Sequence, residues 1–441
     1  MTLTGATMSV EPESFYQAIE SGQGYNAFIS VNTGLSASSG TEGALAGMYI
    51  AVKDNIHVAG LPNSAGTVML KDFVPKEDAV VIARLKAAGA QIIGKNNMHE
   101  LAYGITSNNA AYGAVHNAVN FDYMAGGSSG GTASAVALGM ATAGLGTDTG
   151  GSSRIPAALN GLVGFRPTTG RYSNSGMTMI SNTRDTVGPI TNTVADAVLM
   201  DRILSANSKA APQINISQLR LGVPRDYFYL DLDPDVARVT EQLLIRLTDA
   251  GAELVEADIK DISHLNEKVG FPLVLFETSQ LLPAYLEKYW PDATVDQLID
   301  QIASPDVEQL VTDAMEGVIP ETVYLAARDV HRPLLQQAYA DYFRSQVVDA
   351  IIFPTTPLPA SPLEADMSTV DFYGVQVPAF PTYIRNTDPS SNSGIPGVSI
   401  PAGLSAEGLP IGIELDGPTG SDTKLLAIAA SVEALLAHGP G

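Results

Sequence analysis

The sequence predicts a layered α/β fold around a largely parallel or mixed sheet. Short apolar runs alternate with amphipathic helical stretches through much of the chain, which is typical of such folds. Of the 441 residues, 45% are hydrophobic and 16% are charged, so the chain can bury a sizeable core and does not have the composition of a disordered protein. No internal repeat or long linker interrupts the pattern. We therefore expect a single domain over residues 1–441.

The expected strands and helices follow one another as in an α/β unit. A short helix near Phe15–Gly22 comes before a buried apolar strand at Gly47–Val52. The further elements are expected, in chain order, at Glu77–Ala90 (helix), Gln91–Gly94 (strand), Leu219–Pro224 (strand), Asp233–Ala250 (helix), Glu253–Val255 (strand), Ala350–Pro354 (strand) and Val398–Pro401 (strand).

One region, residues 261–346, departs from this alternation. It is mostly helical in pattern and is rich in aromatic residues, namely Phe271, Phe276, Tyr285, Tyr289, Trp290, Tyr324, Tyr339, Tyr342 and Phe343. These side chains are either ordinary core or the cap of a substrate pocket. The sequence leaves both interpretations open.

Charge and cysteine content restrict the function classes. The formal net charge is −23, and such a surface repels phosphate backbones, so we expect no nucleic-acid partner. We interpret the charge as a source of solubility. The absence of cysteine excludes disulfides, zinc–thiolate sites and a cysteine nucleophile.

The sequence gives no sign of membrane targeting. The first residues lack a basic region followed by an apolar stretch, so we expect no signal peptide. The most apolar stretch, Ala133–Leu145, is broken by small and polar residues and is too short to span a bilayer. The cytoplasm is therefore the expected location.

The segment Ala125–Ala157 is unusually dense in Gly, Ser and Ala. An expected helix, Thr132–Ala143, joins two serine clusters, Ser128–Ser129 and Ser152–Ser153. A tightly packed structural crossover would explain either cluster alone. The glycine spacings required for phosphate-binding loops are absent. The cluster around Ser128 fits G-x-S-x-G, but neither a hydrophobic strand before it nor a suitable late histidine supports a nucleophile elbow.

A serine nucleophile without histidine needs another base, and lysine is the usual substitute. The six histidines lie in contexts typical of structural residues. The motif S-x-x-K occurs at Ser421–Lys424 without the partner motifs that would make it catalytic. Lys53 directly follows the strand Gly47–Val52, where desolvation would lower its pKa and produce a neutral amine. The alternative is a strand-end lysine that extends to solvent.

Together these segments resemble the amidase signature family. The resemblance covers most of the chain and rests on the motifs VKDN, GGSSGG, GTDTGGSSRIPA and GLVGFRPTTGRYS. It implies a layered α/β/α sandwich around a large mixed, twisted sheet, with a helical excursion over the active site. It also implies a Ser–cis-Ser–Lys triad: Ser152 as nucleophile, Ser128 as bridging serine after a cis bond from Gly127, and Lys53 as base. The family spacing fits, with 75 residues from Lys53 to Ser128 and 24 from Ser128 to Ser152.

The resemblance assigns further residues around the nucleophile. An oxyanion hole is expected from the backbone N–H groups of Thr149, Gly150, Gly151 and Ser152. The loop precedes an expected helix, Ser153–Asn160, whose positive end would favour an oxyanion. Asp148 and Arg154 match supporting positions. The chain departs from the family pattern at Ser153, where an aliphatic residue is usual.

Within the family, several stretches resemble the indoleacetamide and mandelamide hydrolases. These include GKNNMHELAYGITSNN and NTRDTVGPI. The resemblance implies a small-molecule amide substrate with an aryl group, no metal and no cofactor. Substrate-binding residues are expected at Ile105, Thr106, Met177 and Ile180, and a homodimer is left open.

Other functions remain open at this stage. The same triad would serve carbamates, anilides or esters. The signature is shared with the glutaminase-type subunit of transfer-RNA amidotransferases, but the charge of −23 disfavours contact with nucleic acid. The complete triad argues against an inactive binding module.

Overall fold

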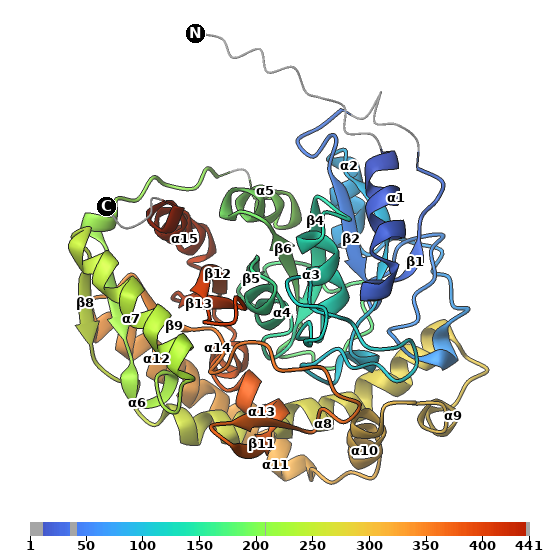
Figure 1. The fold of residues 1–441 in the computed structure, drawn as a ribbon. Helices are drawn as coiled ribbons and strands as arrows, with labels where there is room; N and C mark the ends of the chain where they lie inside the picture. The colour runs from blue at the N-terminus through green and yellow to red at the C-terminus, as the bar shows by residue number, and fades with distance from the viewer. Residues whose placement is uncertain (1–11, 36–41, 208, 438–441) are drawn as a thin grey trace.

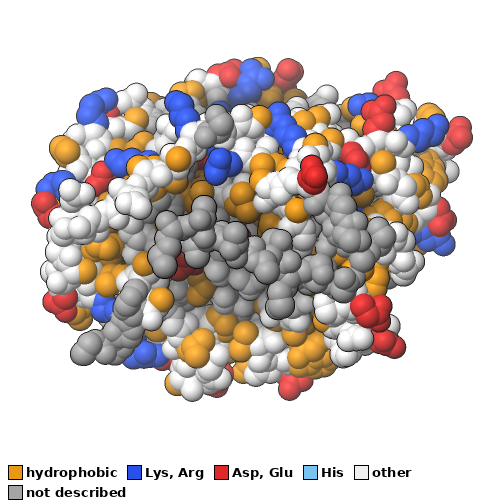
Figure 2. All heavy atoms as spheres, turned by 90° about the horizontal axis from the view of Figure 1, so that it is seen from above, with side chains coloured by type: hydrophobic (Ala, Val, Ile, Leu, Met, Phe, Trp, Pro, Cys, Tyr) orange, Lys and Arg blue, Asp and Glu red, His pale blue; other side chains and the backbone are white. Residues whose placement is uncertain are grey.

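The computed structural model describes residues 12–35, 42–207 and 209–437. The first eleven residues, on which the signal-peptide expectation depends, lie outside this range. Within it, no helix is both long and apolar enough to cross a membrane. On the face seen in Figure 2, acidic and basic side chains are scattered among apolar ones.

Eleven strands form one mixed sheet, as the sequence predicts for the fold class. Their order across the sheet is β1-β3-β2-β4-β6-β5-β12-β13-β9-β7-β8. In Figure 1 the sheet runs from β1 on the right to β8 on the left. The bounds are β1 (Phe28–Val31), β2 (Tyr49–Lys53), β3 (Gln91–Asn96), β4 (Ala143–Asp148), β5 (Val163–Arg166), β6 (Thr186–Thr191), β7 (Arg220–Val223), β8 (Glu253–Glu256), β9 (Ala350–Pro354), β12 (Gly397–Leu404) and β13 (Pro410–Asp416); a separate hairpin comprises β10 (Thr369–Phe372) and β11 (Val375–Pro378).

Two parallel groups stand at either side of an antiparallel centre. β2 is parallel to β3 and β4, and β7 is parallel to β8 and β9. The strands between them pair antiparallel. Because the carboxyl ends of parallel strands lie at the same edge of a sheet, the residues that follow β2 and β4 lie close together.

Helices cover both faces of the sheet and extend below it. Their bounds are α1 (Pro12–Ser21), α2 (Val80–Ala87), α3 (Gly130–Ala137), α4 (Arg154–Leu159), α5 (Val194–Leu204), α6 (Arg225–Phe228), α7 (Pro234–Asp249), α8 (Ile262–Tyr289), α9 (Val295–Ile299), α10 (Pro305–Met315), α11 (Glu321–Ala326), α12 (Arg332–Gln346), α13 (Ala379–Ile384), α14 (Asp388–Ser393) and α15 (Asp422–Ala437). The long α8 runs along the lower side of the molecule in Figure 1, with α10 and α11 near it.

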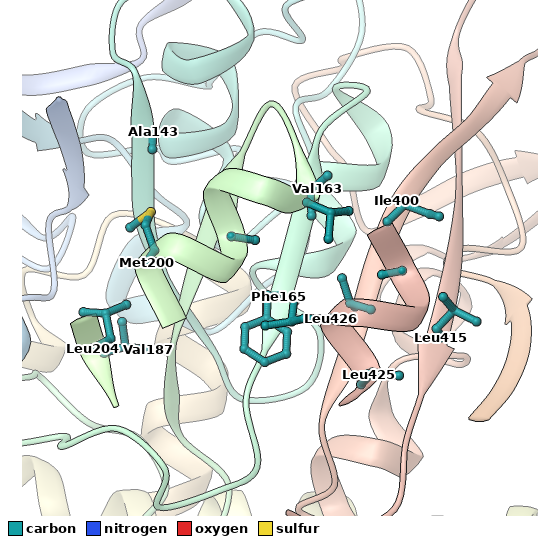
Figure 3. Close-up of a cluster of buried hydrophobic side chains, with 14 of the residues drawn as sticks. Ala143, Val163, Phe165, Val187, Met200, Leu204, Ile400, Leu415, Leu425 and Leu426 are labelled. Atoms are coloured by element: carbon teal, nitrogen blue, oxygen red, sulfur yellow. The ribbon is translucent and has the colours of Figure 1, made fainter. Parts of the chain in front are cut away.

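The main core lies between the sheet and helices α2, α5, α7 and α15. Figure 3 shows part of it: Val187 of β6 lies beside Leu204 of α5, and on the other side of Phe165 lie Leu425 and Leu426 of α15, near Leu415 of β13. Burial of such apolar side chains is the main force that holds these layers together.

The small-residue segment differs from its expected structure in one respect. The helix expected over Thr132–Ala143 ends at Ala137 in the structure. Gly139 adopts φ +69°, a left-handed conformation that terminates helices, and β4 begins at Ala143. The strand was not expected, because Ala143–Asp148 contains two glycines and lacks a continuous apolar run.

Candidate functional site

Lys53 is the last residue of β2, and its side chain is completely buried. Its Nζ lies 2.7 Å from the Ser128 hydroxyl oxygen and 2.8 Å from the Thr147 hydroxyl oxygen. Burial lowers the pKa of Lys53 to about 7, although Asp148 and Asp185 act in the opposite direction. At neutral pH a large fraction of this side chain is therefore a free amine.

Ser128 lies in the turn that leads into α3, and it is fully buried. The Gly127–Ser128 peptide bond is cis. A Cβ at Gly127 would lie 2.8 Å from the Ser107 hydroxyl, so the position requires glycine. The next residue, Ser129, donates its N–H to the Ser152 carbonyl at 3.2 Å. This hydrogen bond joins the two serine clusters, which are distant in the sequence.

Ser152 lies in the loop between β4 and α4 and lines a cavity. Gly151, just before it, has φ +138°, and a Cβ there would overlap the Thr387 side chain, so only glycine fits. Within the described residues, the N–H groups of Gly150, Gly151 and Ser152 have no protein acceptor. These donors are thus available to a group bound in the cavity.

The carbonyl groups of this loop are fixed by neighbouring side chains. Thr387 donates its hydroxyl to the Gly150 carbonyl at 2.6 Å, and Arg184 donates Nε–H to the Thr149 carbonyl at 3.1 Å. The Thr149 hydroxyl donates to Asp185 at 2.6 Å. These bonds orient the loop before any ligand arrives.

Asp148 and Arg154 form a buried ionic cluster behind the loop. Arg154 donates two N–H groups to Asp148 at 3.0 Å each, and Arg166 donates to the same carboxylate at 2.9 Å. Burial would raise the pKa of Asp148, but the two guanidinium groups outweigh it and hold the pKa well below its usual range. Arg154 also pairs with Glu414 on β13. The cluster therefore ties the loop to the centre of the sheet.

The cavity beside Ser152 has a volume of about 240 Å³. It is lined by Ala102, Tyr103, Gly104, Ile105, Thr149, Gly150, Ser152, Ile180, Arg184, Tyr227, Asn266, Glu267, Gly270, Phe271, Val274, Leu310, Phe380, Pro381, Ile384, Arg385 and Asp388. Helices α8, α10 and α13 contribute most of its apolar side chains. Within the lining, Arg184 and Asp388 form an ion pair, so their opposite charges cancel.

Two of the four residues expected to bind substrate lie elsewhere. Ile105 and Ile180 line the cavity. Thr106 does not: its hydroxyl lies 3.4 Å from His99 Nδ1 and accepts the Asn108 N–H. Met177 packs into the main core, beside its bridge to Ile56. Thr106 follows the lining residue Ile105 directly, whereas Met177 lies three residues before the lining residue Ile180.

Three residues of the cavity lining, Arg184, Phe380 and Ile384, were not expected from the sequence. Arg184 lies in the stretch NTRDTVGPI, which resembles the arylamide hydrolases, and this resemblance is the signal that could have indicated it; its burial is evident only in the structure. Phe380 and Ile384 lie on α13, a short helix with no sequence signal of its own. Their role follows only from the tertiary arrangement.

The other groups weighed in the sequence lie away from Ser152. His57 Nε2 is 2.9 Å from the Tyr285 hydroxyl, and burial, with Lys95 and Lys288 adding to it, lowers its pKa to about 4. Lys424 of the S-x-x-K motif pairs with Asp349 at the surface, at 2.7 Å. Among the described residues, no group of three or more His, Asp or Glu is placed to hold a metal ion.

Comparison with known proteins gives consistent results. The amidase family model matches residues 31–426. The chain is 44% identical over 390 residues to an indoleacetamide hydrolase of Rhizobium radiobacter, covering 88% of this chain and 83% of that protein. It is 42% identical over 442 residues to a mandelamide hydrolase of Pseudomonas putida, covering 94% and 85%.

The fold agrees with these matches. A solved amidase structure superposes with a TM-score of 0.84 at 32% identity and covers 96% of both chains. The family model spans most of the sequence, and both relatives are more than 40% identical to it over the aligned residues. The chain therefore belongs to the amidase family and is a hydrolase that acts on amides.

Proposed function

We propose that the protein hydrolyses aryl-substituted carboxamides through an acyl-enzyme on Ser152, with Ser128 and Lys53 as the proton relay. The observation that carries this proposal is the 2.7 Å contact between the buried Lys53 Nζ and the Ser128 hydroxyl. The hydrogen bond from Ser129 to the Ser152 carbonyl supports it, because it holds the turn of Ser128 against the loop of Ser152.

In the proposed acylation, the Ser152 hydroxyl gives its proton to Ser128 while Ser128 gives its own to neutral Lys53. The Ser152 oxygen attacks the amide carbon. The N–H groups of residues 149–152 donate hydrogen bonds to the carbonyl oxygen and stabilise the negative charge that develops on it. Lys53 then returns its proton through Ser128 to the leaving nitrogen, the C–N bond breaks, and the amine departs.

Deacylation uses the same groups in the same order. A water molecule takes the place of the amine and loses a proton through Ser128 to Lys53 as it attacks the ester. The bond to Ser152 breaks, the serine recovers its proton, and the carboxylic acid leaves. The cycle balances without a metal or organic cofactor.

The cavity supports an uncharged aryl group as the acyl side chain. Its wall carries Phe271, Val274, Leu310 and Phe380, and an aromatic ring gains most when such surfaces exclude water around it. Two relatives are named for indoleacetamide and mandelamide, both aryl-substituted amides. We extend the proposal to residues 261–346 as the cap of the pocket within a single domain.

The test compares alanine variants of two neighbouring serines, Ser152 and Ser153. Ser152→Ala should abolish turnover of indoleacetamide and mandelamide, and a sulfonyl fluoride should label Ser152 in the parent protein. Ser153→Ala, with its hydroxyl directed away toward the Gly188 carbonyl, is the matched control and should keep most activity. Labelling at Ser128, or turnover by Ser152→Ala, would refute the assignment.

A substrate panel tests the acyl group separately. Primary arylacetamides should be hydrolysed faster than acetamide. Preference for carbamates or p-nitrophenyl esters would keep the triad but change the substrate class. Activity that appears only with glutamine and a partner protein would contradict the proposal.

A further inference from the structure

A second buried lysine stands beside the first. Lys95 lies on β3, which pairs in parallel with β2, and it is as completely buried as Lys53. The surroundings of the two side chains differ. Lys53 meets two hydroxyl groups, whereas Lys95 Nζ lies 3.1 Å from Asp54 Oδ1, 3.1 Å from Asn63 Oδ1 and 3.2 Å from the Pro62 carbonyl.

Asp54 is the residue that could disturb Lys53. It follows Lys53 directly, and a carboxylate close to the amine would favour the protonated, inactive form. Both of its oxygens are engaged elsewhere. Oδ1 faces Lys95, and Oδ2 accepts the Ser64 N–H at 2.8 Å and the Ser64 hydroxyl. Asp54 is the turn residue that follows β2, and its carboxylate contacts Lys95 and Ser64, whereas Lys53 contacts Ser128 and Thr147, so the two side chains diverge.

We propose that Lys95 is a positioning residue for the base: its ion pair with Asp54 neutralises that carboxylate and keeps it directed away from Lys53. This inference rests on the proposed function, in which Lys53 must lose its proton to act. Lys95 touches neither Ser128 nor Ser152 and acts only through Asp54.

The other charges that face Lys53 make this pairing important. Asp148 on β4 and Asp185 before β6 both favour its charged form. Asp148 is held by Arg154 and Arg166. An unpaired Asp54 would add a further negative charge next to the amine. Lys95 of β3 thus neutralises Asp54 by an ion pair, as Arg154 and Arg166 neutralise Asp148.

A hydrogen-bond chain leads from this ion pair to the pocket wall. Asn63, which contacts Lys95, donates to the Tyr285 hydroxyl at 3.3 Å, and Tyr285 belongs to α8. His57 meets the same hydroxyl, and with its pKa lowered to about 4 it stays neutral near pH 7. The titration of His57 therefore lies well below that of Lys53.

The test is the pH dependence of the acylation rate in four proteins: the parent, Lys95→Gln, Lys95→Arg and the double variant Lys95→Gln with Asp54→Asn. Glutamine keeps a donor for Asn63 and Pro62 but removes the charge. In Lys95→Gln, the rising limb of the acylation rate against pH should therefore move up by about one pH unit. Arginine keeps the charge and should leave the limb within a few tenths of a unit of the parent. The double variant should bring the limb back.

The outcomes separate the inference from the proposal beneath it. A lower rate for Lys95→Gln with an unmoved limb, or a shift that persists in the double variant, would show a merely structural lysine and overturn the inference. If circular dichroism shows that Lys95→Gln does not fold, Lys95→Met is measured in the same way. The shift of its rising limb, and the return of the limb when Asp54→Asn is added, then decide the inference. If Lys53→Ala keeps the parent rate and limb, the proposed function itself fails.

Discussion

The small-residue unit (residues 125–159) and the helical wall (residues 262–346) meet at one cavity but are built differently. The unit is almost wholly buried, and its loop is fixed by glycine-only positions and by the Asp148–Arg154 cluster. The wall contributes apolar side chains to the cavity, and Phe271 among them is 54% exposed. Under the proposed function, the unit would carry out bond cleavage and the wall would select the acyl group of the substrate.

The largest expected effect comes from the base. Lys53→Ala should lower kcat by about 10⁴-fold, the usual scale for loss of a triad member. If Lys53 and the unit act on all substrates alike, the loss should be equal for arylacetamides and acetamide. Single-turnover rates on both amides measure it. A loss confined to one substrate would break the distinction between the two regions.

Ser128→Ala should cost less, about 10²–10³-fold in kcat, because water can partly replace the missing hydroxyl between Lys53 and Ser152. KM should hardly change, since Ser128 does not line the cavity. Steady-state kinetics with one arylacetamide is sufficient. A rise in KM with an unchanged kcat would instead place Ser128 in substrate binding.

Gly151→Ala should lower kcat by roughly 100-fold, near the effect of losing one oxyanion donor. The added methyl overlaps Thr387 and requires φ +138°, so the loop must shift. Gly170→Ala is a matched control with positive φ but open space around it, and it should keep its activity at a small cost in stability. Thermal unfolding of both variants separates loop geometry from a general loss of folding.

Phe271→Ala should lower kcat/KM for arylacetamides about tenfold and leave acetamide nearly unchanged, because only the larger acyl group reaches this wall. Phe276→Ala is the control on the same helix; its ring stacks on Tyr324 and does not line the cavity. The ratio of the two substrates is the measured quantity. Equal losses on both would deny the wall its selective role.

The smallest effect should come from His57, which lies behind the wall. The parent acylation rate should rise about tenfold from pH 5 to 6, then level off above 7, because only the deprotonated Lys53, with a pKa of about 7, is active. His57→Gln should keep this limb within a few tenths of a unit, since the histidine is already neutral there. Loss of the limb in this variant would assign it to the imidazole.

The two regions also differ in how well the sequence predicts them. The motifs of the unit, together with VKDN on β2, resemble the amidase signature, and that resemblance named Lys53, Ser128 and Ser152 as candidates beforehand. In the wall, a residue lines the cavity only if its helix face points inward, and α8 has aromatic residues on several faces. Phe271 therefore could not be distinguished from Phe276. Thr106 and Met177 do not line the cavity, and loops have no fixed period from which the direction of their side chains could be predicted.

The strand pairing of β2 has a consequence for insertions and deletions. Val52 lies beside Leu145 in a parallel ladder, and the next residue, Lys53, donates to the Thr147 hydroxyl. A one-residue deletion in β2 would shift each later residue by one place in this ladder and turn its side chain to the other face of the sheet. One residue removed from β2 would bring Asp54 to the place of Lys53, beside Asp148, and would leave Lys95 without its carboxylate. Surface loops elsewhere can change length freely, but between Tyr49 and Lys53 a single deletion would replace the base with an acid.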